Sequence, residues 1–274
     1  MRASRVRWGT TGTMTLIVLV INVPIIMMVL NSFQTTADIR SSTSLIPKSL
    51  TLANYVFLGS STPFFTYLRN SVFNALGAAA LSLAAAVPGG YALSRFRTGL
   101  LSVYSSALFA VQMFPIILAL IPLFILFRAM GLIDNPLSVM IVYAVLNLPF
   151  VTWMARSYFD TIPRELEEAG LIDGCNHYSA FFRVVLPLTG PGLAAVSIFA
   201  FLMAYNEFFV ANVFLRTQQT MTLPVGIQMF MQQFSTDWGS VMAASTLMMV
   251  PTLILFLFVQ KFITHGAISG AVKG

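Results

Sequence analysis

Six long, predominantly apolar stretches of this chain carry no charged side chain, and they limit the possible fold more than any other feature. Cutting the sequence at Asp, Glu, Lys and Arg leaves eight uncharged windows of at least 20 residues, about the length that a transmembrane helix needs. Two of these windows are too polar to span a membrane, because 49–68 is rich in Ser and Thr and 217–236 carries five glutamines. The other six windows predict six helices, near residues 13–33, 69–93, 101–126, 136–156, 189–211 and 241–262.

Composition supports this prediction. The chain is 57% hydrophobic and 9% charged, with a mean hydropathy of +0.83. A soluble domain of this length could not bury so much apolar surface. We therefore expect an all-α integral membrane protein. The net charge of +6 is small and does not indicate a nucleic-acid partner, and a single cysteine, Cys175, permits no internal disulfide.

The distribution of Lys and Arg predicts the orientation in the membrane. If the N-terminus faces the cytoplasm, ten basic residues fall on the cytoplasmic side and five on the outer side, as the positive-inside rule requires. Both termini and the loop 157–188 are then cytoplasmic. The basic start resembles a signal peptide, but its apolar run is long and lacks a small-residue cleavage site, so we expect a retained first helix.

The longest polar segment runs from Asp160 to Pro191 and contains five of the nine acidic residues. Its pattern predicts two short helices. The first starts near Pro163 and ends at Gly174, since glycine tolerates the left-handed conformation of a helix end. Asn176 can cap the second helix. That helix carries an apolar face of Tyr178, Phe181, Phe182 and Val185, which we expect to pack on the helices of the same chain.

This segment resembles the EAA loop of importer-type ABC transporter permeases. The matching residues are Glu168, Ala169, Gly170, Asp173 and Gly174, followed after eleven residues by Leu186 and Pro187. The family usually has Ala at the position of Gly170 and often at that of Cys175. Further points of resemblance are Asn54-Tyr55, the segment Tyr91-Ala92-Leu93-Ser94-Arg95, and Tyr205-Asn206-Glu207, where the family usually has Trp in place of Tyr. The C-terminal Gly-Ala-Val-Lys-Gly resembles the second permease of maltose-type, carbohydrate-importing systems.

The resemblance implies a type I importer permease in a bacterial inner membrane. It would be a single transmembrane domain over 1–274, with a coupling loop at 157–188 and a cytoplasmic tail at 264–274. The seven residues of the EAA match would dock on a dimer of ATPase subunits, with Glu168 pairing a basic residue there. Further implied partners are a second, non-identical permease and an extracytoplasmic sugar-binding protein, for which residues 212–240 offer a contact. This chain would hold no cofactor, because ATP and Mg would bind the ATPase.

Polar residues inside the predicted spans are the candidates for a sugar pathway. Such side chains are costly in lipid unless they face a cavity or another helix. The candidates are Gln112, Tyr143, Asn147, Asn206 and Glu207. Each of them could instead form an interhelical hydrogen bond that only holds the bundle together, and the sequence leaves both roles open.

Motifs for other functions are missing from the sequence. The chain has no Gly-rich phosphate loop ending in Gly-Lys-Ser/Thr and no zinc-protease or nucleophile-elbow motif, so it is not predicted to be an enzyme. The alternative is a secondary, ion-coupled transporter of small solutes. Such a carrier needs ionisable residues within its spans, and only Glu207 qualifies.

Overall fold

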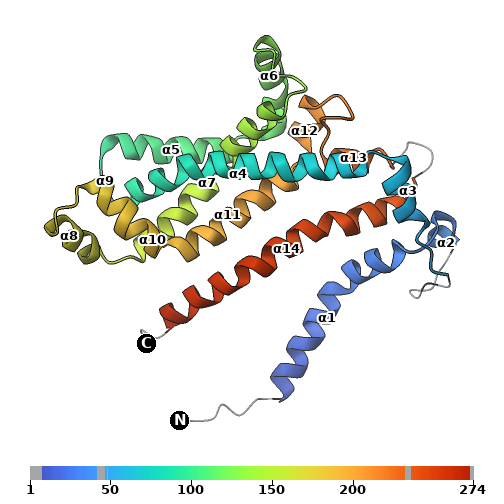
Figure 1. The fold of residues 1–274 in the computed structure, drawn as a ribbon, viewed down its shortest axis with the longest axis horizontal. Helices are drawn as coiled ribbons and strands as arrows, with labels where there is room; N and C mark the ends of the chain where they lie inside the picture. Colours follow the sequence, from blue (N-terminus) through green and yellow to red (C-terminus); the bar gives the residue numbers. More distant parts are fainter. Residues whose placement is uncertain (1–7, 42–46, 48, 232–235, 272–274) are drawn as a thin grey trace. The chain divides into compact units, whose positions relative to one another are not determined.

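The computed structural model of the chain describes residues 8–41, 47, 49–231 and 236–271, and within them the regular structure is helical (Figure 1). An isolated antiparallel bridge joins Met231 to Thr236. The predicted all-α class is confirmed. The chain divides into two compact units, Met1–Phe64 with Gly226–Met249 and Phe65–Val225 with Val250–Gly274.

The first unit is built around the end of its long N-terminal helix. Its elements are α1 (Trp8–Asn31), α2 (Thr36–Ser41), α3 (Ala53–Ser61), the second half of α13 (Leu223–Gln228) and the start of α14 (Trp238–Ala271). The Asn54 side-chain amide donates to the backbone oxygens of Ser32 and Gln34, both at 2.8 Å. The hydroxyls of Tyr55 and Ser32 lie 2.5 Å apart. The Asn-Tyr pair therefore fastens α3 to the turn that follows α1.

The second unit contains the remaining helices. They are α4 (Phe64–Arg95), α5 (Gly99–Met113), α6 (Ile116–Ala129), α7 (Pro136–Asp160), α8 (Arg164–Ile172), α9 (His177–Ala180), a π-helix (Phe181–Val185), α10 (Leu186–Leu188), α11 (Gly190–Tyr205) and α12 (Phe209–Phe214). Helix α7 is central, since it packs against α5, α11 and α12.

Close packing of α4 on α7 depends on glycines. A Cβ atom at Gly90 would lie 2.9 Å from the backbone nitrogen of Arg156, and one at Gly77 would lie 2.6 Å from the sulfur of Met140. Ala78 and Ala86 are fully buried in the same helix. The Gly- and Ala-rich stretch of α4 thus lets the two backbones approach closely, as expected where lipid provides no hydrophobic drive between helices.

Among the described residues, four helices are long and apolar enough to cross a membrane. They are Thr11–Asn31, Phe64–Arg95, Pro136–Asp160 and Trp238–Phe258. Two bent pairs pass the same test together, α5 with α6 and His177–Leu188 with α11. The described helices thus give four spans, or the predicted six when each bent pair is counted as one span.

Breaks in the helices correct two of the predicted spans. The continuous helix expected over 101–126 is broken at Phe114–Pro115, where α5 and α6 meet at 102°. Phe114 has an extended backbone (φ −80°, ψ 123°), which is the conformation that a following proline favours. The helix expected over 189–211 ends at Tyr205 and resumes as α12.

Candidate functional site

The segment between α7 and α11 folds as the predicted helix–glycine–helix unit. Helix α8 follows Pro163 and carries Glu165 and Glu167 in its first turn, where the helix dipole favours negative charge. Gly174 ends it with a positive φ of 92°. The Asn176 side chain then accepts the backbone N–H of Ser179 at 2.8 Å. The predicted glycine stop and asparagine cap are both confirmed.

The apolar face expected on the second helix is only half correct. Phe181 and Val185 are buried, but Tyr178 is 80% exposed and Phe182 is 59% exposed. The reason is the π-helical turn from Phe181 to Val185. It widens the helix to i→i+5 hydrogen bonds and shifts the phase of the residues around it. Phe181 and Val185 pack instead with Tyr91, Ala155 and Phe159 in one apolar cluster.

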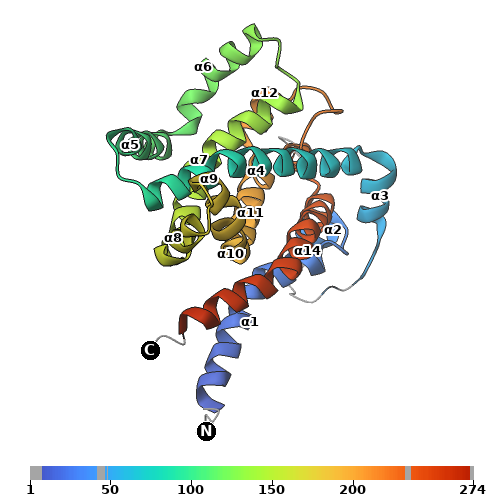
Figure 2. The ribbon, with the colours of Figure 1, turned by 60° about the vertical axis from the view of Figure 1, so that its left-hand side comes forward.

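A buried ion pair joins α8 to the end of α4. Arg95 Nε donates to Glu167 Oε2 at 2.9 Å, and the exposed side-chain fractions are 6% and 9%. The Tyr91 hydroxyl donates to the other carboxylate oxygen of Glu167. Arg95 also donates to the backbone oxygen of Ile162 at 3.0 Å. Both views place α8 and α9 near the C-terminal end of α4 (Figure 1 and Figure 2).

Two further contacts strengthen this junction. Arg164 donates to the backbone oxygens of Ser94 and Arg95, at 3.2 and 3.4 Å. The Ser94 hydroxyl donates to Asp160 at 2.5 Å. The last carbonyl groups of α4, which have no partner within their own helix, are thereby satisfied from the neighbouring segment.

The sequence analysis missed Tyr91, Arg95 and Glu167 as a group. Tyr91 and Arg95 lie four residues apart, so they share one face of a helix, and that spacing was visible in the sequence. Glu167 could not be distinguished from Glu168 by sequence, because only the packing of α8 shows which of the two glutamates is buried.

The residues predicted to dock on an ATPase fall into two groups. Glu168, Ala169, Asp173, Gly174 and Pro187 are exposed, whereas Gly170 is buried and Leu186 is partly buried. A Cβ atom at Gly170 would lie 3.3 Å from Val184 Cγ2. The position where the family usually has Ala is thus tightly packed in this chain.

Large apolar side chains are also exposed on this segment. Ile172 is 85% exposed and Leu166 is 45% exposed, besides Tyr178 and Phe182. Exposed apolar side chains of this size, next to charged ones, are typical of a surface that contacts another protein. The surface of α8 and α9 thus combines large apolar side chains with charged ones.

The predicted pathway residues have different surroundings. Asn147 is buried on α7 and its amide donates to the Ala200 oxygen at 2.9 Å. The hydroxyl of Tyr143, also buried, donates to the backbone oxygen of Glu207 at 3.3 Å. The Glu207 carboxylate accepts the backbone N–H of Val210 at 3.1 Å, at the start of α12. Asn206 and Gln112 are exposed. The structure thus brings Tyr143 and Glu207 together but leaves Gln112 and Asn206 on the surface.

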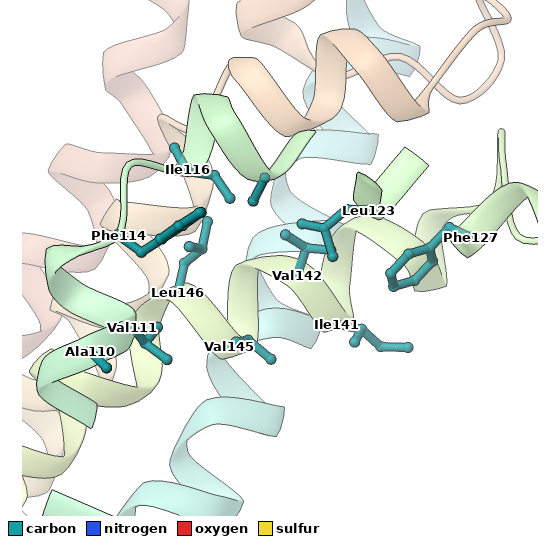
Figure 3. Close-up of a pocket in the computed structure, with 11 residues that line it drawn as sticks. Ala110, Val111, Phe114, Ile116, Leu123, Phe127, Ile141, Val142, Val145 and Leu146 are labelled. Atoms are coloured by element: carbon teal, nitrogen blue, oxygen red, sulfur yellow. The ribbon is translucent and has the colours of Figure 1, made fainter. Parts of the chain in front are cut away.

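A cavity of about 410 Å³ lies between the bent pair α5–α6 and α7 (Figure 3). Its walls are entirely apolar side chains, among them Phe114, Leu123, Val142 and Leu146. None of the predicted pathway residues lines it. Because a sugar needs hydrogen-bond donors and acceptors for its hydroxyl groups, this cavity is not suited to one.

In the described part of the chain, no cluster of His, Cys, Asp and Glu could hold a metal ion. Of the glutamines in segment 212–240, which the sequence predicts to face outward, Gln232 and Gln233 lie outside the described residues, as do the last three residues of the predicted tail.

Comparison with known proteins identifies the family. A family model described as "Binding-protein-dependent transport system inner membrane component" matches residues 78–268. The sulfoquinovosyl glycerol transport system permease SmoH of Agrobacterium fabrum is 36% identical, over 92% of this chain and 88% of that protein. The diacetylchitobiose uptake system permease DasC of Streptomyces coelicolor is 33% identical, over 92% and 91%.

A solved structure shows the same fold. A chain of a bacterial ABC transporter involved in the import of the acidic polysaccharide alginate superposes with a TM-score of 0.78 at 25% identity, over 95% of this chain and 98% of that one. The fold is that of a type I importer permease. The chain therefore belongs to the family of inner-membrane components of binding-protein-dependent transport systems, the permeases of ABC importers.

Proposed function

We propose that this chain forms half of the translocation pathway of a sugar or oligosaccharide importer, and that it receives mechanical work from an ATPase dimer through α8. The observation that carries the proposal is the arrangement of α8. Glu167 is anchored in the chain's own packing, whereas Glu168, Asp173 and Ile172 are exposed beside it. As a permease component, the chain is not itself the enzyme.

The orientation follows from the basic residues. Ten of the fifteen Lys and Arg residues fall on one side when the N-terminus is inside, so we assign the termini and the 157–188 loop to the cytoplasm. The ATPase dimer is cytoplasmic in this assignment. ATP and Mg bind there, and Glu168 pairs with a basic residue in its docking groove.

Similarity supports a carbohydrate as the transported solute. SmoH, DasC and the alginate transporter are each named for a sugar derivative or saccharide. Within this chain, Gln112 and Asn206 are the pathway candidates with exposed side chains. Tyr143 and Asn147 are buried and bonded to neighbouring backbone, so we assign them to bundle packing. Glu207 uses its carboxylate to cap α12 and is a weaker pathway candidate than Asn206.

Two further partners complete the assembly. A second, non-identical permease pairs with this chain across the pathway. A solute-binding protein contacts the outer segment 212–240, where Gln218 and Gln219 are exposed. No residue of α1 between Thr11 and Asn31 is fully buried by the described chain, and the apolar surface of this helix faces lipid or this second permease.

The docking assignment can be tested in the assembled importer. Glu168→Lys reverses the exposed charge on α8, and Ile172→Asp replaces an apolar side chain that is 85% exposed on the same helix. Both variants should lower co-purification of the ATPase and solute uptake at least tenfold. Glu165→Gln changes a neighbouring exposed carboxylate on the same helix and serves as the control. Normal assembly and uptake in the Glu168 variant would remove the docking claim.

A further inference from the structure

The junction between α4 and α8 is held by several directional hydrogen bonds to buried charged groups, and not by apolar packing alone. Glu167 uses both carboxylate oxygens, one for Arg95 Nε and one for the Tyr91 hydroxyl. Arg95 uses a second nitrogen for the backbone oxygen of Ile162, just before α8 begins. Charge-assisted hydrogen bonds of this kind are short and directional. They fix the rotation of α8 about its axis as well as its distance from α4.

The two neighbouring glutamates of α8 face different surroundings. Successive residues of an α-helix point about 100° apart, and here Glu167 is 7% exposed while Glu168 is exposed. A rotation of α8 that carried Glu167 out of its site would therefore also turn Glu168 away from its present direction. The buried carboxylate determines where the exposed one points.

Burial makes this junction hard to open. Arg95 and Glu167 are both almost withdrawn from water, so either charge alone would be left without solvation or a partner. The other ion pair at this end of the unit, Arg156 with Asp160, is wider at 3.5 Å and its side chains are 33% and 49% exposed. Such an exposed pair contributes little.

A second contact holds α8 without fixing its rotation. Gly170 packs closely on Val184 of the π-helical turn, and that turn belongs to the apolar cluster around Tyr91 and Phe181. Apolar packing is non-directional, so it can keep α8 near the bundle while allowing it to turn. The rotation of α8 is therefore fixed by its directional contacts, which are the buried ion pair and the hydrogen bonds from Arg164 to the Ser94 and Arg95 backbone oxygens.

We propose that Tyr91, Arg95 and Glu167 act as positioning residues that make α8 and the C-terminal end of α4 move as one body. Force received on the exposed face of α8 passes through this buried contact into α4, which crosses the membrane. The inference rests on the proposed docking of α8 on an ATPase. It goes beyond that proposal by naming α4 as the helix that receives the force. Glu167 does not touch the ATPase.

The test uses the complete importer in proteoliposomes, with its solute-binding protein, and compares Glu167→Gln with Glu165→Gln. The first change removes the buried charge and keeps the side-chain shape. The second removes an exposed charge from the same helix. Three quantities are measured: ATPase co-purification, ATP hydrolysed per solute imported, and hydrogen exchange of the α8 backbone amides.

For Glu167→Gln we expect normal co-purification, at least threefold more ATP hydrolysed per solute, and at least tenfold faster exchange in α8. The Glu165 variant should match the wild type in all three. Equal stoichiometry and equal exchange in the two variants would overturn the positioning role. Loss of the ATPase from the Glu167 variant with unchanged exchange in α8 would also overturn it, because it would show direct docking by Glu167 rather than positioning of α8.

A second variant protects the test against misfolding. Arg95→Lys keeps the positive charge but has no second nitrogen in place for the Ile162 oxygen. It should fold and assemble, and it should show the same two changes to a smaller degree. If the wild-type chain itself does not co-purify with the ATPase, the proposed function fails. If only the positioning proposal fails, the ATPase still co-purifies, and the Glu167 and Glu165 variants show the same ATP stoichiometry and the same exchange in α8.

Discussion

Asn147 on α7 donates its side-chain amide to the backbone oxygen of Ala200 on α11, at 2.9 Å, and both residues are buried. The bond ties together the two helices that pack most extensively in the second unit. It also determines how a polar residue in a predicted span should be interpreted. A side chain that is buried and bonded to a neighbouring helix is a packing element, whereas an exposed one can meet a solute.

Asn147→Leu should therefore lower stability without changing solute affinity. The leucine has a similar volume but no donor, and interhelical hydrogen bonds in membranes contribute about 1 kcal/mol. We expect a lower thermal midpoint of the detergent-solubilised complex and an unchanged KM for uptake. The matched change is Asn206→Leu on the exposed pathway candidate. For this variant we expect an unchanged thermal midpoint and an increased KM for uptake. An increased KM for the Asn147 variant would indicate that Asn147 contacts the solute.

The close contact of α4 with α7 predicts that alanine substitutions at Gly90 and Gly99 have very different effects on stability. In Gly90→Ala the added methyl group would meet backbone, with Arg156 N at 2.9 Å, which cannot move aside as a flexible side chain can. Overpacking of this kind costs about 1–3 kcal/mol. Gly99→Ala adds a methyl group with no atom within 4 Å and should be tolerated. Membrane-inserted protein levels and thermal midpoints of the two variants give the comparison, and equal values would contradict the close helix contact.

Asp134 organises the turn between α6 and α7. Its carboxylate accepts the backbone N–H of Arg216 at 2.8 Å and of Thr217 at 3.1 Å, and the Thr220 hydroxyl. Burial raises the pKa of this carboxyl, but the hydrogen bonds from Thr220, Arg216 and Thr217 outweigh it and hold the pKa below its usual value of 3.8. The ionised form is therefore favoured by folding.

The sign of the pH dependence follows from that direction. The stabilisation by Asp134 is complete well above pH 3.8 and is lost as the pH falls through the lower folded pKa. We expect protease cleavage within residues 215–220 to increase in acid for the wild type. Asp134→Asn keeps a residue that tolerates the positive φ of 61° at this position. The substitution should lower the free energy of local opening by about 1 kcal/mol, so the variant should be cleaved faster at neutral pH. It should also lose most of the acid dependence. An unchanged acid dependence in the variant would place the titrating group elsewhere.

Local signals in the sequence predicted the parts of the site that local chemistry controls. Gly174 and Asn176 each act on the backbone within a few residues, so their roles as stop and cap could be derived from the sequence alone. Proline was less informative. Pro115 lies at a 102° bend, whereas Pro122 and Pro149 lie inside continuous helices. Tertiary packing decides between these outcomes, because neighbouring helices can satisfy or replace the missing hydrogen bond.

Burial of Glu167 and the π-helical turn depend on contacts between segments far apart in the sequence. Glu167 meets Tyr91 and Arg95 more than 70 residues earlier in the chain. No periodicity within residues 160–191 encodes that meeting. The phase shift that exposes Tyr178 and Phe182 has the same origin, since the cluster around Tyr91 has room for Phe181 and Val185.

Cys175 offers a direct test of the proposed orientation, because it is the single cysteine of the chain and is partly exposed next to Gly174. A membrane-impermeant maleimide should label it in inside-out vesicles and leave it unlabelled in intact spheroplasts. For the control, Ser60→Cys is introduced with Cys175→Ser. Ser60 is exposed on α3, in the loop assigned to the outside, so this variant should label in spheroplasts. Bound ATPase should slow the labelling of Cys175 in vesicles, since it would cover the segment beside Gly174. Labelling of Cys175 from outside would place α8 across the membrane from any cytoplasmic ATPase, and the coupling role would then be untenable.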